Sequence, residues 1–364
     1  MSSALEQLHQ TLGGRRTTVR AAVSGPSWIA DYGVVGERAF DREAEIGLVD
    51  RSWAGRLELV GEDRFRFLNG LVTCDVSAER LPAGSVRYGF LTEGKGRILS
   101  DLQLVALEDR LWLELPAGRA AAVREHLEKY IVADRVDVRP LADFALLALV
   151  GPSVWDRLAE RYGIDASAAQ RAQRVGLAGT DVLMHSHPRL GIEAAQLWVS
   201  SGIAAPLAED LLEGLAARPL GNDVLEELRV AAGIPAWGVD FDERHLPGEV
   251  AVAGAVDWDK GCYLGQEIVA RMHYRGAPAR QLRIVSGEGS APENGAALLH
   301  GGASAEAEKT VGALASVLAA APPDTEEPRW SGLAMLRRAV LEEEEFRLAD
   351  GRAVRLVGEP LPAS

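Results

Sequence analysis

The octapeptide KGCYLGQE at Lys260–Glu267 places a cysteine beside a lysine and between two glycines. The residues that follow it, as far as Met272, carry apolar side chains at helical spacing, so Cys262 is expected at or just before the N-terminus of a helix. Unpaired backbone N–H groups there, the helix dipole and the positive charge of Lys260 favour a thiolate over a thiol. The octapeptide therefore predicts a reactive Cys262.

The residues alone also allow a structural role for this cysteine. Free cysteines are more often small hydrophobic residues of the core than nucleophiles, and Asp257 and Asp259 would offset part of the positive charge nearby. Both interpretations of Cys262 stay open on this evidence. The other cysteine, Cys74, has mainly apolar neighbours in LNGLVTCDV and is expected to be buried.

A basic strip extends from the octapeptide towards the C-terminus. Between Lys260 and Arg283 the chain has five cationic residues and one acidic residue, Glu267, which gives a local charge of +4 in a chain of −14. The cationic residues are Lys260, Arg271, Arg275, Arg280 and Arg283. Such a strip suits an anionic small molecule or a phosphate.

The composition narrows the class of protein. The chain has 364 residues, of which 47% are hydrophobic and 25% charged, as in a globular protein of two or three domains. A net charge of −14 argues against a general nucleic-acid-binding surface. The chain lacks an apolar leader and any run of about 18 apolar residues, so neither export nor a membrane location is expected and the cytoplasm is the expected compartment.

Metal sites and disulfides are not expected either. Two cysteines are too few for a disulfide framework or for a zinc site built from thiolates. The alternating histidines of HSHP, His185 and His187, have no carboxylate or thiol near them in the sequence and are expected in a surface turn.

The periodicity of the chain predicts an α+β organisation. Between Val86 and Val150, one amphipathic helix is preceded by the strand-like segments VRYGFLT, RILSDLQLVAL and RLWLEL and followed by RVDVRPL and FALLALVGP. The last of these is apolar throughout and is expected to be buried on both faces. Two helices are expected between Pro206 and Gly233. Beyond Ala277, short strand-like segments separated by Gly, Pro and acidic clusters predict a small β-barrel or sandwich.

The octapeptide resembles the signature of the YgfZ-type folate-binding proteins, which are paralogues of the glycine-cleavage T-protein, an aminomethyltransferase. Three further segments are similar to elements of that family and occur in the same order. They are FLNGLVTCDV at residues 67–76, GKGRILSDLQL at residues 94–104 and LRVAAGIP at residues 228–235. TVGALASV and LAMLRRAV resemble strands of the family's C-terminal barrel, so the resemblance covers nearly the whole chain.

The resemblance implies an α+β protein of three domains in a ring, with tetrahydrofolate bound near the central hole. It implies that the first domain is discontinuous, made of residues 1–60 and 145–275, with an inserted α+β domain at 61–144. Residues 277–364 are expected to form the C-terminal β-barrel.

The implied role is folate-dependent support of iron–sulfur cluster assembly or repair, with effects on iron–sulfur enzymes that include tRNA-modifying ones. The implied partners are therefore a folate and iron–sulfur proteins or their assembly factors, without direct nucleic-acid or membrane binding. Cys262 is the implied functional thiol, as a single ligand to iron, a sulfur carrier or a partner in disulfide exchange. Its motif partners are Lys260, Tyr263, Gln266 and Glu267. Arg229 and Arg271 are implied to lie beside the folate cleft.

Two departures from the T-protein pattern weaken the aminomethyltransferase alternative and leave folate binding without that chemistry. Where the T-protein has a pair of acidic residues this chain has Ser100 and Asp101, and its pterin-side motif is represented only by RLGIEAAQ, with Glu193 offset. A tetrahydrofolate-dependent aminomethyltransferase would use Asp101 as its acid–base group, although Asp101 could equally be a polar residue on the exposed face of a strand. A protein-binding adaptor that uses its β-rich end is the third alternative.

Overall fold

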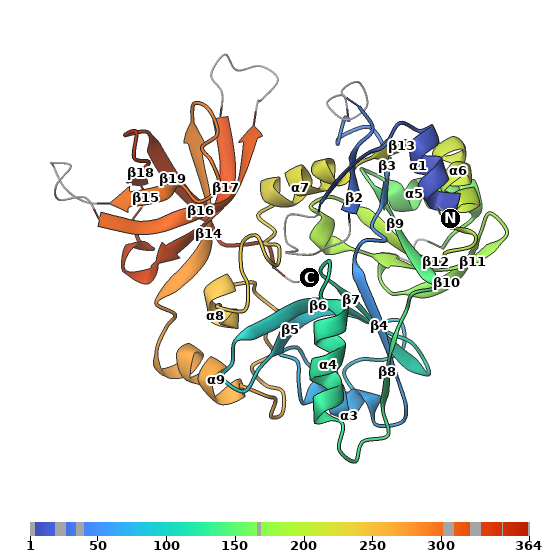
Figure 1. The fold of residues 1–364 in the computed structure, drawn as a ribbon, viewed down its shortest axis with the longest axis horizontal. Coiled ribbons are helices and arrows are strands. Elements are labelled where there is room, and N and C mark those ends of the chain that lie inside the picture. The colour runs from blue at the N-terminus through green and yellow to red at the C-terminus, as the bar shows by residue number, and fades with distance from the viewer. Residues whose placement is uncertain are drawn as a thin grey trace.

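The computed structural model describes residues 4–18, 27–33, 40–165, 169–300, 309–320, 329–343 and 345–362. Three lobes, each built on a β-sheet, surround the centre of the molecule (Figure 1). A two-stranded hairpin, β1 (Arg15–Thr18) with β2 (Ser27–Asp31), is added near the N-terminus. No helix in the described ranges combines the length and apolar character needed to span a membrane.

The first lobe is a six-stranded sheet. Its strands, in spatial order, are β10 (Gln173–Leu177), β11 (Thr180–Ser186), β12 (Ala194–Ser200), β9 (Phe144–Val150), β3 (Gly47–Asp50) and β13 (Arg218–Leu220). One face is covered by α1 (Ala4–Thr11), α5 (Val154–Tyr162) and α6 (Ala204–Gly214), and the other by α7 (Asn222–Ala231) and the short helix η2 (Pro188–Leu190). The apolar strand β9 lies inside this sheet, with Leu147 and Leu149 towards one core and Ala148 and Val150 towards the other. The prediction that this segment is buried on both faces is confirmed.

The second lobe is a five-stranded antiparallel sheet. Its order is β5 (Val86–Thr92), β6 (Ile98–Ala106), β7 (Arg110–Leu115), β4 (Gly55–Val60) and β8 (Asp137–Pro140). Helices α3 (Arg64–Asn69) and α4 (Ala120–Tyr130) cover its outer face. Its inner face contacts both other lobes: Trp112 packs on Trp198 of the first, with ring centroids 5.1 Å apart, and Phe90 shares a cluster with Leu333 of the third. This sheet therefore holds the three lobes together.

The third lobe is a closed barrel, as expected from the sequence. It contains β14 (Arg280–Glu288), β17 (Arg329–Arg337), β16 (Lys309–Ala320), β15 (Ala297–His300), β18 (Glu345–Arg347) and β19 (Ala353–Gly358), with the short helix η4 at Arg338–Val340. Helices α8 (Pro247–Val250) and α9 (Gln266–Arg275) precede it in the chain.

The α+β class and the positions of the strands between Val86 and Val150 are confirmed by these sheets. The expected domain boundaries stay a prediction, since strand pairing shows only which strands share a sheet. Strand β4 lies before the expected boundary at residue 60, in the discontinuous domain. It nevertheless pairs with β7 and β8 of the inserted segment.

Candidate functional site

A cavity lies at the centre, where the inner face of the five-stranded sheet meets α7 and the segment after it. Its solvent-accessible volume is about 160 Å³. Strands β6 and β7 contribute Asp101, Gln103 and Glu114, and the other side is formed by α7 with Arg229 and by the aromatic ring of Trp237. The close approach of η2 to α7 needs a glycine, because a Cβ on Gly191 (φ +83°) would lie 2.4 Å from a backbone oxygen of α7.

Seven buried polar atoms of the cavity wall have no hydrogen-bond partner in the part of the chain that the structure describes. They are Nε1 of Trp28, Nε of Arg51, Oδ1 of Asp101, Oε1 of Gln103, Oε2 of Glu114, Nδ1 of His187 and Nη1 of Arg189. Buried polar groups in proteins nearly always have partners. A wall that leaves both donors and acceptors without partners is suited to a polar ligand with complementary groups.

Glu114 carries a negative charge at the base of the cavity. Burial by itself would raise the pKa of this carboxyl, but the Arg51 guanidinium, 2.6 Å away, and the nearby His187 lower the pKa well below its usual range. The carboxylate is thus held ionised, with Oε1 bound to Arg51 and Oε2 without a hydrogen-bond partner among the described residues.

Asp101 is in the opposite electrostatic situation. Burial raises its pKa, while Arg189 and a 2.9 Å hydrogen bond from Tyr88 Oη to Oδ2 act to lower it, and the net shift is upward. Arg189 lies over the ring of Tyr88, 3.9 Å from its centroid. Asp101 is half-buried and lines the cavity, so the alternative of a polar residue on an exposed strand face is wrong.

Arg229 also lines the cavity, but its donors are used within the protein. It binds Glu226 through Nε and Nη2, donates to Asp240 at 2.8 Å, and donates to Ser316 of β16 at 3.1 Å. Burial would lower the pKa of Arg229, but Asp240 and Glu226 raise it. Arg229 therefore fastens α7 to the barrel and keeps its charge.

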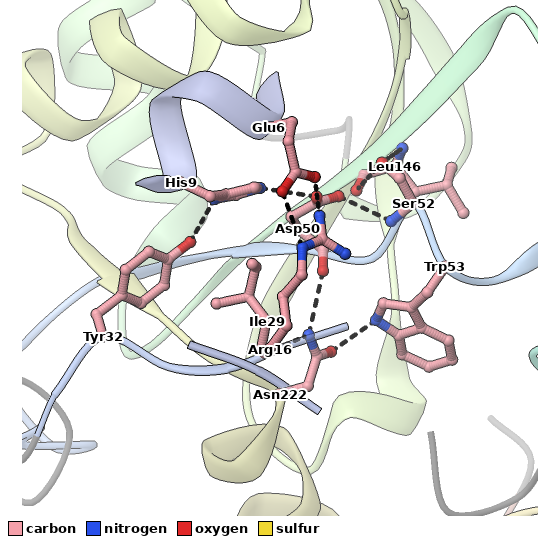
Figure 2. A network of polar contacts seen from close by, with 10 residues as sticks. All are labelled: Glu6, His9, Arg16, Ile29, Tyr32, Asp50, Ser52, Trp53, Leu146 and Asn222. Atoms are coloured by element: carbon pink, nitrogen blue, oxygen red, sulfur yellow. Dashed lines mark hydrogen bonds and ion pairs between the residues drawn. The ribbon is translucent and has the colours of Figure 1, made fainter. Parts of the chain in front are cut away.

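A polar network connects the cavity to the N-terminal segment (Figure 2). Asn222, at the start of α7, accepts a hydrogen bond from the indole of Trp53 at 2.8 Å and donates to backbone oxygens of β2 and β3. Asp50 of β3 binds His9 at 2.8 Å, and His9 binds the Tyr32 hydroxyl at 2.6 Å. These contacts position Trp53 and Asn222 in the cavity wall.

Lys260 of the octapeptide is buried, with 7% of its surface exposed. Its ammonium donates to three backbone carbonyls at the end of α3 and in the segment after it: Asn69 at 2.9 Å, Val72 at 2.7 Å and Cys74 at 2.7 Å. Burial lowers its pKa to about 8. Because all three N–H donors of its ammonium are used, Lys260 holds the octapeptide against the end of α3 and the segment after it. The expected effect of its positive charge on the Cys262 thiol stays a prediction.

The octapeptide continues as a docked turn. Leu264 N–H donates to Gly70 at 2.9 Å, and the Thr92 hydroxyl donates to the Leu264 carbonyl at 2.6 Å. Cys262 itself is exposed. The helix α9 begins at Gln266 with Gly265 as N-cap, so Cys262 precedes the first helical residue by four positions. The helix N-terminus therefore stabilises a Cys262 thiolate less than expected, since the helix dipole acts mainly within the first turn.

The remaining octapeptide residues support this turn. The Gln266 side chain accepts from the Tyr263 N–H at 3.2 Å, and the Tyr263 ring is buried, which raises its pKa to about 12. Glu267 and Arg271 form an exposed ion pair at 3.0 Å along α9.

The predicted site residues thus fall into separate groups. Asp101 and Arg229 line the central cavity, whereas none of the described lining residues belongs to the octapeptide or is Arg271. Glu193 accepts from the N–H groups of Ser153 and Trp155 and so caps the N-terminus of α5. Whether these residues act in function stays a prediction.

Several polar residues of the cavity wall are not among the predicted site residues. They include Arg51, Gln103, Glu114, His187 and Arg189. The two histidines of HSHP are a recognisable sequence pattern, but the expectation that they lie in a surface turn is wrong, because His185 and His187 are 0% and 4% exposed. Trp198 donates to His185 Nε2 at 3.1 Å, and His187 faces Glu114. The other residues carried no local pattern that indicated a site.

This chain is similar to known proteins in sequence and in fold. Residues 15–260 match the model of the GCVT N-terminal domain. A protein named tRNA-modifying protein YgfZ from Vibrio vulnificus (strain YJ016) is 30% identical over 334 residues, which is 88% of this chain and 93% of that protein. The chain belongs to the YgfZ-type branch of the GCVT-domain family.

Two further similarities agree with this family. The mitochondrial aminomethyltransferase of Dictyostelium discoideum is 25% identical, over 78% of this chain and 74% of that protein. The crystal structure of the glycine cleavage system aminomethyltransferase T from Bartonella henselae has a TM-score of 0.82, with 24% identity over 99% of this chain and 97% of that one. The latter likeness shows that the three-lobed fold is that of the T-protein.

The buried His185 predicts a pH-dependent stability. Burial and the neighbouring His187 lower its pKa from 6.5 to about 4. Between pH 6.5 and 4 the unfolded chain takes up a proton that the folded chain does not, so stability is complete above pH 6.5 and falls with decreasing pH, by up to about 3 kcal/mol at pH 4. Urea unfolding at pH 7, 5.5 and 4 measures this loss, which His185→Gln is expected to reduce by about that amount.

His273→Gln on the exposed face of α9 is the matched control, and its acid-induced loss is expected to equal that of the wild type. An identical loss in His185→Gln and in the wild type would show that His185 is not the group responsible.

Proposed function

We propose that this protein binds a tetrahydrofolate-type ligand in the central cavity and, through Cys262, supports the assembly or repair of iron–sulfur clusters. The observation that carries the ligand proposal is the set of seven unpartnered polar atoms in the cavity wall. The family membership makes a folate the ligand class of choice. Relatives bear the name tRNA-modifying protein, and tRNA modification is the process in which we propose that this chain acts.

The chemistry of the wall fits a pterin. A pterin ring is flat and carries N–H donors and ring-nitrogen and carbonyl acceptors along its edge. The acceptors Asp101, Gln103 and Glu114 suit its donors, and the N–H groups of Arg51 and Trp28 suit its acceptors. Trp28 and Trp53, which pack edge to face at 5.1 Å, together with Tyr88 and Trp237, offer aromatic surface for its faces. When bound, tetrahydrofolate would supply a carrier of one-carbon units.

In this proposal the Cys262 thiol acts outside the central cavity that binds the pterin. Cys262 is exposed, and within the described ranges no group of three or more His, Cys, Asp or Glu side chains is arranged to hold a metal ion. Because common clusters need four ligands, a single thiol would act on iron or sulfur transiently, with the client protein supplying the other ligands. We propose the cytoplasm as the compartment, where an exposed thiol stays reduced.

Strand β6 provides a physical connection between the two places. The turn before it packs against the octapeptide, since a Cβ at Gly96 would lie 3.1 Å from the Gly265 carbonyl oxygen. Asp101 lies on the same strand and lines the cavity. One strand therefore contacts both the cavity and the octapeptide that carries the thiol.

A tetrahydrofolate-dependent aminomethyltransferase is the second candidate function, and the environment of Asp101 favours it. A carboxyl with a raised pKa and one unpartnered oxygen in the cavity is suited to move a proton at a folate nitrogen. Formation of 5,10-methylenetetrahydrofolate from an aminomethyl donor, and its loss in Asp101→Asn, would establish this activity.

The same variant tests ligand binding. Asp101→Asn is expected to weaken the binding of tetrahydrofolate monoglutamate about tenfold, because a carboxylate acceptor at the ring edge is lost. Isothermal titration calorimetry measures the change. Asp109→Asn, in an exposed turn next to Arg110, is the control and is expected to bind as the wild type does.

If the wild type gives no heat with tetrahydrofolate, the folate proposal fails and the protein-binding adaptor becomes the better account. If Asp101→Asn binds with unchanged affinity, the ligand lies elsewhere in the molecule.

A further inference from the structure

A second cavity adjoins the central one. It has a solvent-accessible volume of about 530 Å³ and is formed by the loop before β5, the segment before β10 and the end of β11. Tyr88, Gln103 and Arg189 line both cavities. These three side chains form a shared wall, so a group in the second cavity would lie against the same residues as a ligand in the first.

The wall of the second cavity is positively charged. Arg87, Arg171 and Arg189 line it, and none of the described lining residues carries a carboxylate. This excess occurs in a chain with a net charge of −14. Arg87 and Arg171 are exposed, whereas Arg189 is 8% exposed, so the positive charge extends from the surface to a buried wall.

Arg171 is held in position by the backbone below it. Its Nη2 donates to the Ala83 carbonyl at 3.0 Å. Gly84 has a φ of +89°, and a Cβ there would lie 2.9 Å from Arg171 Nε, so the guanidinium occupies space that only a glycine leaves open. The Ala172 N–H donates to the Gly84 carbonyl at 2.7 Å and keeps the two segments in register.

Arg189 leaves a buried donor unused. Its Nη1 has no hydrogen-bond partner among the described residues, and Nη2 has only a long contact of 3.4 Å to the Pro235 carbonyl. The guanidinium is fixed over the Tyr88 ring and cannot turn to solvent without losing that contact. A buried guanidinium with an unused N–H suits a carboxylate or phosphate oxygen.

We propose that this second cavity, which we call the arginine cavity, binds a carboxylate- or phosphate-bearing group next to the central ligand site. Arg87 and Arg171 attract the anion at the surface, and Nη1 of Arg189 binds it at the shared wall. The anion has two possible sources. It is either the glutamate tail of a folate in the central cavity, which rests on the proposed function, or a separate small anion.

Inorganic phosphate is the probe for the site itself. In calorimetric titrations at low ionic strength the wild type is expected to bind phosphate at one saturable site, and the double variant Arg87→Gln/Arg171→Gln is expected to bind it at least tenfold more weakly. Both arginines are exposed, so the thermal midpoint is expected to stay unchanged. Arg174→Gln is the matched control, because Arg174 is an exposed arginine of the adjacent β10 that pairs with Asp181.

Tetrahydrofolates distinguish the two sources. If the anion is the folate's own tail, the triglutamate binds the wild type at least tenfold more tightly than the monoglutamate, and this advantage disappears in the double variant. If the anion is a separate molecule, both glutamate forms bind equally, and phosphate still binds when the monoglutamate is present.

The proposal is overturned if the wild type shows no saturable phosphate binding and no preference for the triglutamate, or if the double variant keeps either one. The folate proposal fails separately: a wild type that binds phosphate through these arginines but not the monoglutamate would leave the arginine cavity standing.

Discussion

Cys262→Ala is expected to abolish complementation of a strain that lacks this protein's counterpart, while the affinity for tetrahydrofolate changes by less than twofold. The thiol is exposed and no residue of its octapeptide lines the central cavity within the described structure, so the substitution removes the sulfur without touching the pterin site. Complementation is measured by growth and by the activity of an iron–sulfur enzyme, and affinity by calorimetry.

The two cysteines differ enough for a direct chemical test of this prediction. Cys74 is 3% exposed, and burial raises its pKa to about 11, so it is protected from alkylation in the folded protein. Iodoacetamide at pH 7.5 is expected to modify Cys262 alone, and the modified protein is expected to lose its supporting activity in vitro while it retains tetrahydrofolate binding.

Asp259→Ala, in the same exposed turn, is the matched control and is expected to complement fully. Complementation by Cys262→Ala at the level of the wild type would remove the thiol from the mechanism.

Lys260→Met is expected to lower the free energy of unfolding by about 3 kcal/mol, because three backbone carbonyls lose the donor that they share. Methionine keeps most of the side-chain volume, so the loss reports the hydrogen bonds more than the packing. The substitution also releases the turn that presents Cys262 from the segment after α3, and complementation is expected to fall with stability. Urea unfolding and hydrogen exchange of residues 69–74 measure the two effects.

Lys95→Met provides the comparison, since Lys95 is an exposed lysine in the turn that packs against the octapeptide, and its removal is expected to change stability by less than about 0.5 kcal/mol. Equal stabilities of the Lys260→Met variant and the wild type would mean that water satisfies these carbonyls and that Lys260 is kept for another reason.

Local periodicity was sufficient for most of the secondary structure. The segments VRYGFLT and RLWLEL coincide with β5 and β7, and the fully apolar FALLALV coincides with β9. These strands have side chains that must be buried on one or both faces, and burial leaves a period of two or an unbroken apolar run in the sequence. The pairing of strands leaves no such pattern in the sequence. The expected domain boundary at residue 60 therefore separates β4 from β7 and β8, the strands with which it pairs.

Only part of the role of the octapeptide can be predicted from the sequence. Its resemblance to the YgfZ-type signature identified the family, and Cys262 is exposed as a functional thiol requires. Its position two residues before Cys262 predicts that Lys260 is a charge beside the sulfur. In the folded chain its ammonium reaches carbonyls about 190 positions away in the sequence, because burial compels an ammonium to find acceptors wherever the fold supplies them.

What the sequence by itself determined is the α+β class and, through the resemblance, the family and its C-terminal barrel, since each of these depends on neighbouring residues. The central cavity was decided only by the tertiary structure. Glu114 and His187, 73 positions apart, meet there with Arg51 because two sheets and α7 close around a common space. The ionisation of Glu114 and the raised pKa of Asp101 follow from burial and from charges that the fold brings near, and neither is encoded in a local run of residues.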